Sequence, residues 1–186
     1  MKIINAQAVS EKMTEEETKN FLANNANNLL MRIGTIDGKG EPNVTVTAFY
    51  FDEPSEKILI VTQKDSKKVQ HLKNRNIISY CIDDPNPPYT GARGKGTVKF
   101  LVDIQENIPL ATKYLTKLTG SLDNPFAKWL MNEIENGTAI FLEITPRYFS
   151  TGELRQPHNC NLQRKIARTS KFERNDSNSC EGFSNR

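Results

Sequence analysis

The stretch RIGTIDGKGEPNVTVTAFYFD, residues 32–52, decides the fold that this sequence predicts. An apolar run from Leu29 to Ile36 leads into DGKGEP, and a run that begins with alternating Val and Thr extends from Asn43 to Phe51. Asp37-Gly38 and Gly40 are residue types that supply the positive φ angles of a hairpin turn. The stretch therefore predicts two antiparallel strands joined by a tight turn.

The rest of the pattern predicts more strands, with helices inserted late in the chain. Further strands are expected at ILIVT, at Ile77–Asp83, at Tyr89–Asp103 and at TAIFLEITP, where Pro146 is expected to stop the strand. Helices are expected near residues 14–25, 67–74, 105–118 and 125–136, the first with Thr14 as its N-cap. Six strands joined mostly by tight turns favour a mainly β (α+β), largely antiparallel closed or half-closed barrel with peripheral helices.

Composition favours one domain. The chain has 186 residues, 37% of them hydrophobic, which suits a single core. We expect this domain at residues 1–150. The segment 151–186 is rich in Asn, Ser and Arg, so we expect a polar, weakly ordered C-terminal arm, within which LQRKIARTSKF is the one portion able to form a short helix or bind an anionic surface.

Charge and cysteine usage set expectations for partners and compartment. The formal net charge is only +3, which gives little reason to expect nucleic-acid binding. No apolar run approaches the roughly 20 residues of a membrane span, and the N-terminus lacks the apolar segment of a signal peptide. The three cysteines are an odd number at irregular spacing, so a reducing, cytoplasmic location is expected.

Two adjacent lysines follow Ser66 in the stretch IVTQKDSKKVQHL, residues 60–72. The stretch is read as a strand, a turn and a helix whose N-cap is Ser66 or Asp65. Exposed backbone N–H groups and the positive end of the helix dipole form a site for a phosphate monoester, with Lys67 and Lys68 as compensating charges. The alternative is a solvated lysine pair at the start of a surface helix.

The order of these stretches resembles the pyridoxamine 5'-phosphate oxidase-like split β-barrel family. The resemblance rests on GTIDGKGEP, then YFD, then LIVTQKDSKKVQHL, then RGKGTVKFL, and it runs from about Thr14 to Asp103, with a looser match in TAIFLEITP. It implies a six-stranded antiparallel Greek-key split β-barrel that binds FMN, a deazaflavin or, less often, haem. It also implies a homodimer with the cofactor at the subunit interface.

The resemblance also implies which residues bind the cofactor. Val61 and Thr62 are expected beside its ring or ribityl chain, and Ser66, Lys67 and Lys68 at its phosphate. The Arg and Lys that flavin-binding relatives often carry on the preceding strand are missing from VTVTAF. Thr45 and Thr47, which share one face of that strand, are expected to offer hydroxyl contacts instead, or else to lie on a solvent face.

The partner subunit is expected to bring Tyr89 or Arg93 near the ring, although Arg93 also suits a plain strand edge. His71 is read as a surface or satisfied residue, Cys81 as a small buried hydrophobe, and Trp129 as a core anchor. No metal site is expected, because HNC and Cys180 lack zinc-site spacing.

No nucleophile, acid or base constellation is visible, so the catalytic residues stay unknown and catalysis is expected to come from the cofactor. The sequence thus predicts an FMN- or deazaflavin-dependent oxidoreductase that acts on a small molecule. Two alternatives stay open: a non-catalytic flavin-binding or sensing protein, and a haem-binding or haem-degrading protein with His158 as a possible iron ligand.

Overall fold

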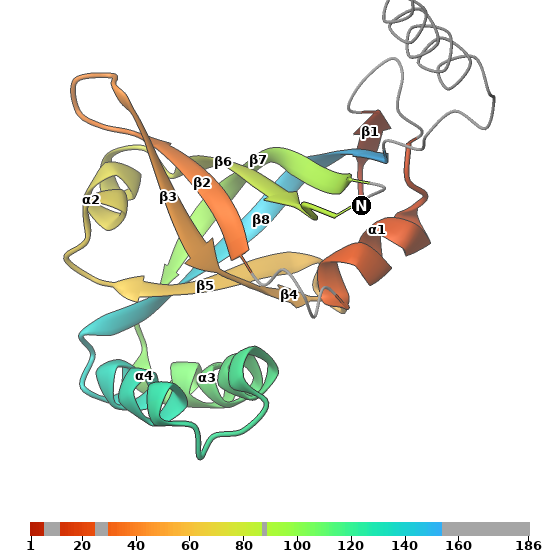
Figure 1. The fold of residues 1–186 in the computed structure, drawn as a ribbon. Coiled ribbons are helices and arrows are strands. Elements are labelled where there is room, and N and C mark those ends of the chain that lie inside the picture. The colour runs from red at the N-terminus through yellow and green to blue at the C-terminus, as the bar shows by residue number, and fades with distance from the viewer. Residues whose placement is uncertain (6–11, 25–29, 87–88, 154–186) are drawn as a thin grey trace, which may run out of the picture. The chain divides into compact units, whose positions relative to one another are not determined.

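A computed structural model describes residues 1–5, 12–24, 30–86 and 89–153. All of them belong to one structural unit, Met1–Arg155. Of the predicted arm 151–186, residues 151–153 belong to the last strand, and the remainder, with Cys160, Cys180 and His158, lies outside the described residues. Figure 1 shows a strongly curled sheet with helices packed around its rim.

The described strands form one eight-stranded sheet in the order β3-β2-β6-β7-β8-β5-β4, with β1 paired to β8. Their bounds are β1 Ile3–Asn5, β2 Leu30–Ile36, β3 Pro42–Ala48, β4 Tyr50–Asp52, β5 Lys57–Gln63, β6 Ile77–Asp83, β7 Thr90–Leu101 and β8 Ala139–Glu153. β6, β7 and β8 are successive antiparallel neighbours, and β5 returns to pair with β8. This is the expected Greek-key connection, and every pair except β1–β8 is antiparallel.

Four helices lie outside the sheet in the described part of the chain: α1 Glu15–Ala23, α2 Lys67–Asn74, α3 Ile104–Thr119 and α4 Pro125–Glu135. The N-terminus of α1 is the predicted one. The Thr14 hydroxyl accepts from the Glu17 N–H at 3.1 Å, and the Glu17 carboxylate accepts from the Thr14 N–H at 2.8 Å. This reciprocal pair is a capping box, which satisfies two backbone donors that a helix start leaves open.

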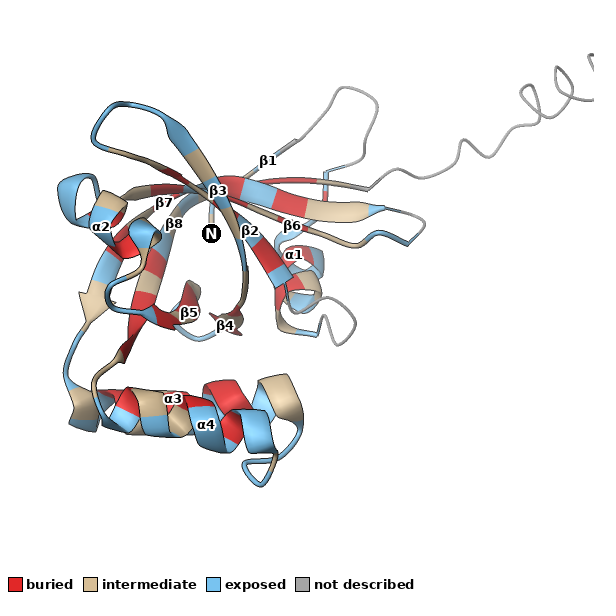
Figure 2. Ribbon diagram, turned by 60° about the vertical axis from the view of Figure 1, so that its left-hand side comes forward, coloured by how far each residue is buried: buried red, intermediate tan, exposed pale blue. Residues whose placement is uncertain are grey.

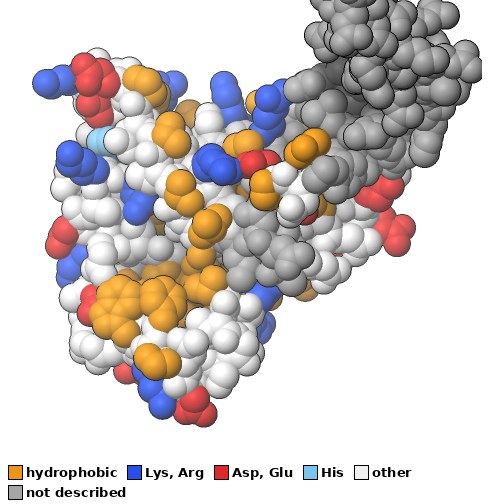
Figure 3. Space-filling view, in the orientation of Figure 1, with side chains coloured by type: hydrophobic (Ala, Val, Ile, Leu, Met, Phe, Trp, Pro, Cys, Tyr) orange, Lys and Arg blue, Asp and Glu red, His pale blue; other side chains and the backbone are white. Residues whose placement is uncertain are grey.

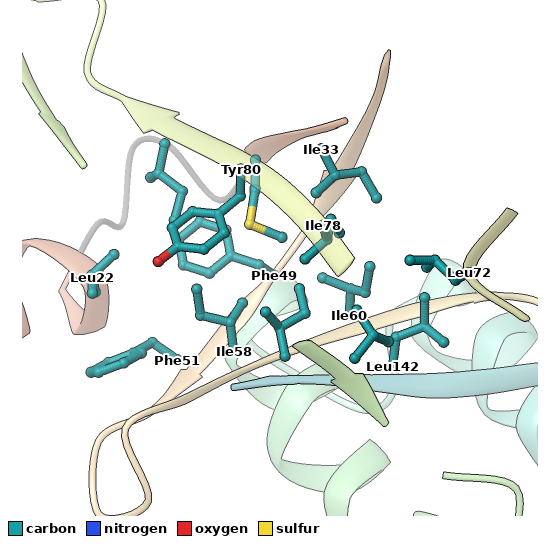
Figure 4. Close-up of a cluster of buried hydrophobic side chains, with 14 of the residues drawn as sticks. Leu22, Ile33, Phe49, Phe51, Ile58, Ile60, Leu72, Ile78, Tyr80 and Leu142 are labelled. Carbon is teal, nitrogen blue, oxygen red and sulfur yellow. The ribbon is translucent and has the colours of Figure 1, made fainter. Parts of the chain in front are cut away.

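The main core fills the interior of the curled sheet. Figure 4 shows side chains from α1, α2 and most strands converging there, among them Leu22, Ile33, Phe51, Ile60, Leu72, Ile78 and Leu142. Phe149 packs edge-on against Phe51 and Tyr80, at centroid distances of 6.5 and 5.7 Å. Because all these side chains are almost fully buried, this cluster supplies most of the hydrophobic stabilisation.

A second core lies between the α3–α4 pair and the other face of β5 and β8. It contains Leu59, Tyr114, Leu115, Ile134 and Phe141, all buried. Figure 2 shows the resulting contrast between strands: β5 is mostly buried, whereas none of β3 is. Strand β5 is covered on both faces because it lies between the two cores.

The predicted fold class is confirmed, with two corrections to the strands. The expected strand 43–51 divides at Phe49, because β3 pairs with β2 while β4 pairs with β5. The Phe49 side chain is buried in the core at the point where the chain changes partners. With β1 added, the described chain has eight strands rather than six.

Pro146 does not end the last strand, contrary to the expectation. β8 continues to Glu153 through a bulge, in which Gly96 pairs with Pro146 and Lys95 with Tyr148. The extra residue, Arg147, takes up the irregularity that a proline without an N–H introduces in a ladder. The second half of β8 is needed because it pairs with β1 and with the start of β7.

Two other expectations about local structure are corrected. In the β2–β3 turn only Gly40 has a positive φ, at 88°, and Gly38 does not. Cys81 is half-buried rather than buried, with its sulfur 3.9 Å from an Asp83 carboxylate oxygen. Among the described residues, none of the helices combines the length and apolar character needed to cross a membrane.

Candidate functional site

The end of β5 and the start of α2 bring three of the predicted cofactor-binding residues together. Ser66 is the N-cap residue of α2, as predicted, but its hydroxyl makes no capping hydrogen bond. Instead it lies 3.3 Å from the Thr62 hydroxyl, and the Lys68 ammonium donates to that Thr62 hydroxyl at 2.7 Å. Thr62, Ser66 and Lys68 therefore form one polar cluster, called the β5–α2 cluster below.

Among the described residues, no carboxylate compensates the charge in this cluster. Lys68 is half-buried, and burial lowers the pKa of its ammonium group. Within the described part of the chain, no ion pair includes Lys68. A partly buried cation whose hydrogen-bond partner is a neutral hydroxyl is well suited to bind an anion.

Lys67 differs from its neighbour, although the sequence treats the two lysines alike. It is exposed on the first turn of α2, and no described hydrogen bond directs its side chain toward the β5–α2 cluster. The first-turn N–H groups of the helix have no intrahelical acceptor. The anion-binding character of this turn therefore comes from Lys68 and from the backbone more than from Lys67.

A cavity of about 300 Å³ lies next to the cluster, between the strands and the α3–α4 pair. Thr47, Val61 and Thr62 of the predicted site line it together. Its other lining residues in the described chain are Ala48, Gln63, Tyr114, Leu118, Phe126, Trp129, Leu130 and Ala139. No charged side chain is among these lining residues, so the cavity itself is apolar with a few hydroxyl and amide groups.

Thr45 and Thr47 do not lie on a solvent face. Each is directly opposite a buried residue of β2, Thr45 opposite Ile33 and Thr47 opposite Met31. Directly opposed residues project to the same side of a sheet, so both threonines face inward and are half-buried. Thr47 lines the cavity, whereas Thr45 lies two residues farther along the same face and does not.

The helix side of the cavity overturns one expectation from the sequence. Trp129 is not a core anchor: it is 51% exposed, and Phe126 beside it is 48% exposed. Figure 3 shows hydrophobic side chains gathered in this region, where α4 meets the barrel. The buried positions of α4 are instead Ala127, Leu130 and Ile134.

Hydrogen bonds fix α4 relative to the end of β5. The Gln63 amide donates to a Glu133 carboxylate oxygen at 3.0 Å, and the Thr138 hydroxyl donates to the same oxygen at 2.7 Å. These two bonds lower the pKa of Glu133. On the floor of the cavity, burial raises the pKa of Tyr114, and a hydrogen bond with the Val61 backbone opposes that rise.

Tyr89 and Arg93 lie apart from this cavity within the subunit. Tyr89 is exposed and has a positive φ of 57°. Arg93 lines a second hollow of about 590 Å³ on the outer face of the sheet, called the outer hollow below. It is lined mainly by residues of β2, β6, β7 and β8, including Arg32, Gly34, Ser79, Cys81, Lys95 and Ser150.

The outer hollow is basic and borders exposed apolar side chains. Arg32 pairs with Asp83, and the lining also contains Arg93 and Lys95. On the same side of the sheet, Val44 and Val46 are 68% and 59% exposed. A surface of this kind is typical of a protein–protein contact rather than of bulk solvent exposure.

One further polar residue of the stretch 60–72, His71, has a structural role. His71 accepts or donates a hydrogen bond at 3.0 Å with the buried Thr35 hydroxyl. It is thus a satisfied structural residue, as the sequence favoured. No group of His, Cys, Asp or Glu suited to a metal ion occurs among the described residues.

The aromatic side of the cavity was missed by sequence reasoning. Phe126 and Trp129 are spaced i, i+3 on one helix face, and Ala127, Leu130 and Ile134 define a different apolar face of the same helix. An apolar stripe wider than one buried face was the available signal. Tyr114 gave no such signal, because a buried tyrosine on an amphipathic helix is ordinary.

Comparisons with known proteins agree with the fold and the order of these elements. The sequence profile of the pyridoxamine 5'-phosphate oxidase family matches residues 14–150. No curated protein matches the chain.

Similar solved structures are numerous. A conserved hypothetical protein from Mycobacterium tuberculosis is 17% identical with a TM-score of 0.67, over 84% of this chain and 96% of that one. A protein described as an F420 reductase is 22% identical with a TM-score of 0.52, over 70% and 94% of the two chains. A pyridoxamine 5'-phosphate oxidase-related, FMN-binding protein from Nostoc punctiforme is 17% identical with a TM-score of 0.52, over 69% and 76%.

Proposed function

Because this chain belongs to the pyridoxamine 5'-phosphate oxidase family, we propose that it binds FMN and transfers hydride to or from a small molecule. The observation that carries the proposal is the β5–α2 cluster. Its half-buried Lys68 ammonium has no carboxylate partner among the described residues, and it lies beside a cavity that contains no charge. An anionic end and an uncharged ring system fit these two neighbouring environments.

The residues present fit the phosphate of such a cofactor. Lys68 donates a charge-assisted hydrogen bond, and the Ser66 hydroxyl, which makes no capping bond, is available as a second donor. The first-turn N–H groups of α2 add dipole stabilisation. Lys67 contributes its charge from the exposed side of the same turn.

Thr62, Val61 and Thr47 form the strand wall along which the rest of the cofactor lies. The Thr47 hydroxyl donates to the Ala48 carbonyl at 3.2 Å, a weak bond that it exchanges readily for a ligand. Thr45 extends the same face and offers a second hydroxyl. Val61 supplies an apolar contact that keeps water from the ring. A bound flavin supplies hydride transfer, and this chain positions it.

A deazaflavin such as F420 is the alternative cofactor, favoured by the likeness in fold to a reductase of that description. Both cofactors carry a phosphate and a flat three-ring system, so the same residues serve either one. The described residues that line the cavity carry no charge, which suits a role in binding and orienting the ring system.

We also propose a homodimer that uses the outer hollow. Val44, Val46 and Leu30 are exposed on the outer face of β2 and β3, and a second copy would bury them. In this dimer Arg93 and Tyr89 of the second copy complete the cofactor groove, each supplied across the interface.

The test compares Lys68→Ala with its exposed neighbour, Lys67→Ala. FMN and F420 are titrated into each purified protein, and binding is followed by flavin fluorescence and calorimetry. Lys68→Ala should lower the affinity for the cofactor at least about tenfold, because a charge-assisted hydrogen bond is worth roughly 1.5–3 kcal/mol. Lys67→Ala should weaken it by about threefold or less, as expected for an exposed charge.

The cofactor-free proteins serve as the control for folding. Neither substitution should lower the melting temperature, since neither lysine takes part in an ion pair among the described residues. Wild-type affinity of Lys68→Ala for both cofactors would mean that the phosphate site lies elsewhere. No binding of either cofactor to the wild-type protein would overturn the proposed function.

A further inference from the structure

We infer that Phe126 and Trp129 form an aromatic platform that binds the substrate, and that this substrate is a flat, uncharged aromatic molecule. That the bound molecule is a substrate rests on the proposed function; that the platform binds such a molecule rests on the geometry below.

The platform is exposed, aromatic and part of a cavity wall. The two rings lie 5.6 Å apart between centroids at an interplanar angle of 40°. Their exposed fractions are 48% and 51%, and both side chains line the cavity of about 300 Å³. A ligand that covers these rings removes a large apolar surface from water, and a flat ring does so with the best geometry.

The platform is held in place before any ligand arrives. The Asn124 side chain caps α4 by accepting from the Phe126 N–H at 2.9 Å, and Pro125 occupies the first helical position. Leu130 and Ile134 are buried against the second core. Because Leu130 and Ile134 pack in the second core and Glu133 accepts a hydrogen bond from Gln63 of β5, the orientation of α4 is fixed and the rings are not free to collapse into the core. The rings of Phe126 and Trp129 are therefore exposed before any ligand binds.

The lining determines the charge of the ligand. None of the described lining residues is Asp, Glu, Lys, Arg or His. A charged group placed against the platform would lose its water without gaining a partner, which is unfavourable. Lys68 bonds to Thr62 but does not line the cavity, so anionic groups are attracted to the β5–α2 cluster instead.

The strand residues and the aromatic platform lie on different sides of the cavity, so the cofactor and the substrate contact different residues. Thr62 belongs both to the cavity lining and to the β5–α2 cluster, whereas the platform lines the cavity from α4. A cofactor held at Lys68 and by the strand residues would leave Phe126 and Trp129 uncovered. The platform is therefore where a second flat ring stacks.

The experiment uses menadione, a flat uncharged quinone, as the probe. Equilibrium dialysis measures its affinity for wild-type protein, Trp129→Ala and Trp129→Phe, each with and without saturating FMN. Trp129→Ala should lower the affinity for menadione at least about tenfold. Trp129→Phe should lower it about threefold or less, because the phenyl ring keeps much of the stacking surface. FMN affinity should change by less than about threefold in both variants.

Leu122→Ala is the matched control. Leu122 is 40% exposed in the α3–α4 connection and does not line the cavity, so its loss should leave menadione binding unchanged. On wild-type protein alone, a naphthoquinone sulfonate should bind at least about tenfold more weakly than menadione, because its charge has no partner there. This comparison decides the inference even where a variant folds poorly.

Three results would overturn the inference. They are wild-type affinity of Trp129→Ala for menadione, displacement of menadione by FMN, and a loss of FMN affinity in Trp129→Ala as large as the loss of menadione affinity, which would assign the platform to the cofactor. A protein that binds menadione as expected but neither FMN nor F420 would support the platform and refute the proposed function.

Discussion

Two hollows in the described part of the chain differ in chemistry. The cavity beside α4 has an uncharged lining and adjoins one half-buried lysine. The outer hollow contains Arg32, Arg93 and Lys95 and borders exposed valines. Two residues of β3 that are three positions apart belong to different hollows: Val44 lines the outer hollow, and Thr47 lines the cavity beside α4. The difference teaches that position along a strand, and not residue type alone, decides which hollow a side chain lines.

The largest expected effect comes from the strand that separates the core from the outer hollow. In Gly94→Ala the new Cβ would lie 2.2 Å from the Tyr148 carbonyl oxygen and 2.5 Å from the Tyr80 hydroxyl. Because the nearest atom is backbone, relief requires β7 and β8 to separate. We expect a loss of at least about 3 kcal/mol in unfolding free energy, and a melting temperature lower by about 10 °C. Thermal unfolding followed by circular dichroism measures it.

Gly38→Ala is the control for that substitution. A Cβ there meets nothing within 4 Å and Gly38 has no positive φ, so stability should stay within about 0.5 kcal/mol of wild type. Equal stability of Gly94→Ala and wild type would show that β7 and β8 are farther apart than described.

The next effect separates the two faces of β3. Val46→Glu places a charge on the outer face, where Val46 is 59% exposed, so the single subunit should stay folded. In the proposed dimer the same carboxylate would lose its water, and Arg32, the cation directly opposite it on β2, already pairs with Asp83, so burial would cost several kcal/mol. We expect dimer dissociation to be favoured at least about 100-fold, measured by size exclusion with light scattering.

Thr47→Val tests the opposite face of the same strand. Thr47 faces inward, so this substitution should leave the oligomeric state unchanged and weaken the cofactor. A Val46→Glu protein that elutes like wild type would exclude this face as the dimer interface.

A smaller effect is expected from Arg93→Ala. In the proposed dimer this side chain reaches the cofactor of the other subunit from a partly exposed position. Its removal should therefore lower the affinity for FMN about fivefold, near 1 kcal/mol in binding free energy. The effect should vanish in the Val46→Glu background, because a single subunit has no partner to supply Arg93. Titration of FMN into the single and double variants checks this coupling; an equal effect in both backgrounds would place Arg93 near the cofactor of its own subunit.

The smallest effect concerns pH. Burial lowers the pKa of Lys68, so its ammonium loses a proton at a lower pH than the usual value of about 10.4. A phosphate binds the charged form, and affinity should therefore fall a few-fold as the pH rises through this lowered pKa, by linkage. FMN titrations at increasing pH should show the fall in wild type and Lys67→Ala but not in Lys68→Ala. A fall that persists in Lys68→Ala would assign it to another group.

Local features of the fold were predictable from the sequence. The capping box at Thr14, the β2–β3 hairpin and the start of α2 at Ser66 depend on residues a few positions apart. The strand Ile77–Asp83 was predicted with the bounds that the structure has. Pro146 misled, because whether a proline ends a strand depends on the partner strand, and here β7 accommodates it with Gly96.

For the candidate site, the sequence by itself determined that a strand is followed by Ser66 and then by a helix that begins with two lysines. It could do so because turn and helix-start propensities act between neighbouring residues. Only the tertiary structure decided that Lys68 bonds to Thr62 while Lys67 stays exposed, and that Trp129 borders a cavity instead of filling the core. The physical reason is that burial depends on which surface a distant segment presents. β5 meets α4 across more than 60 residues of intervening chain, and the local periodicity of α4 does not say which distant segment the helix meets.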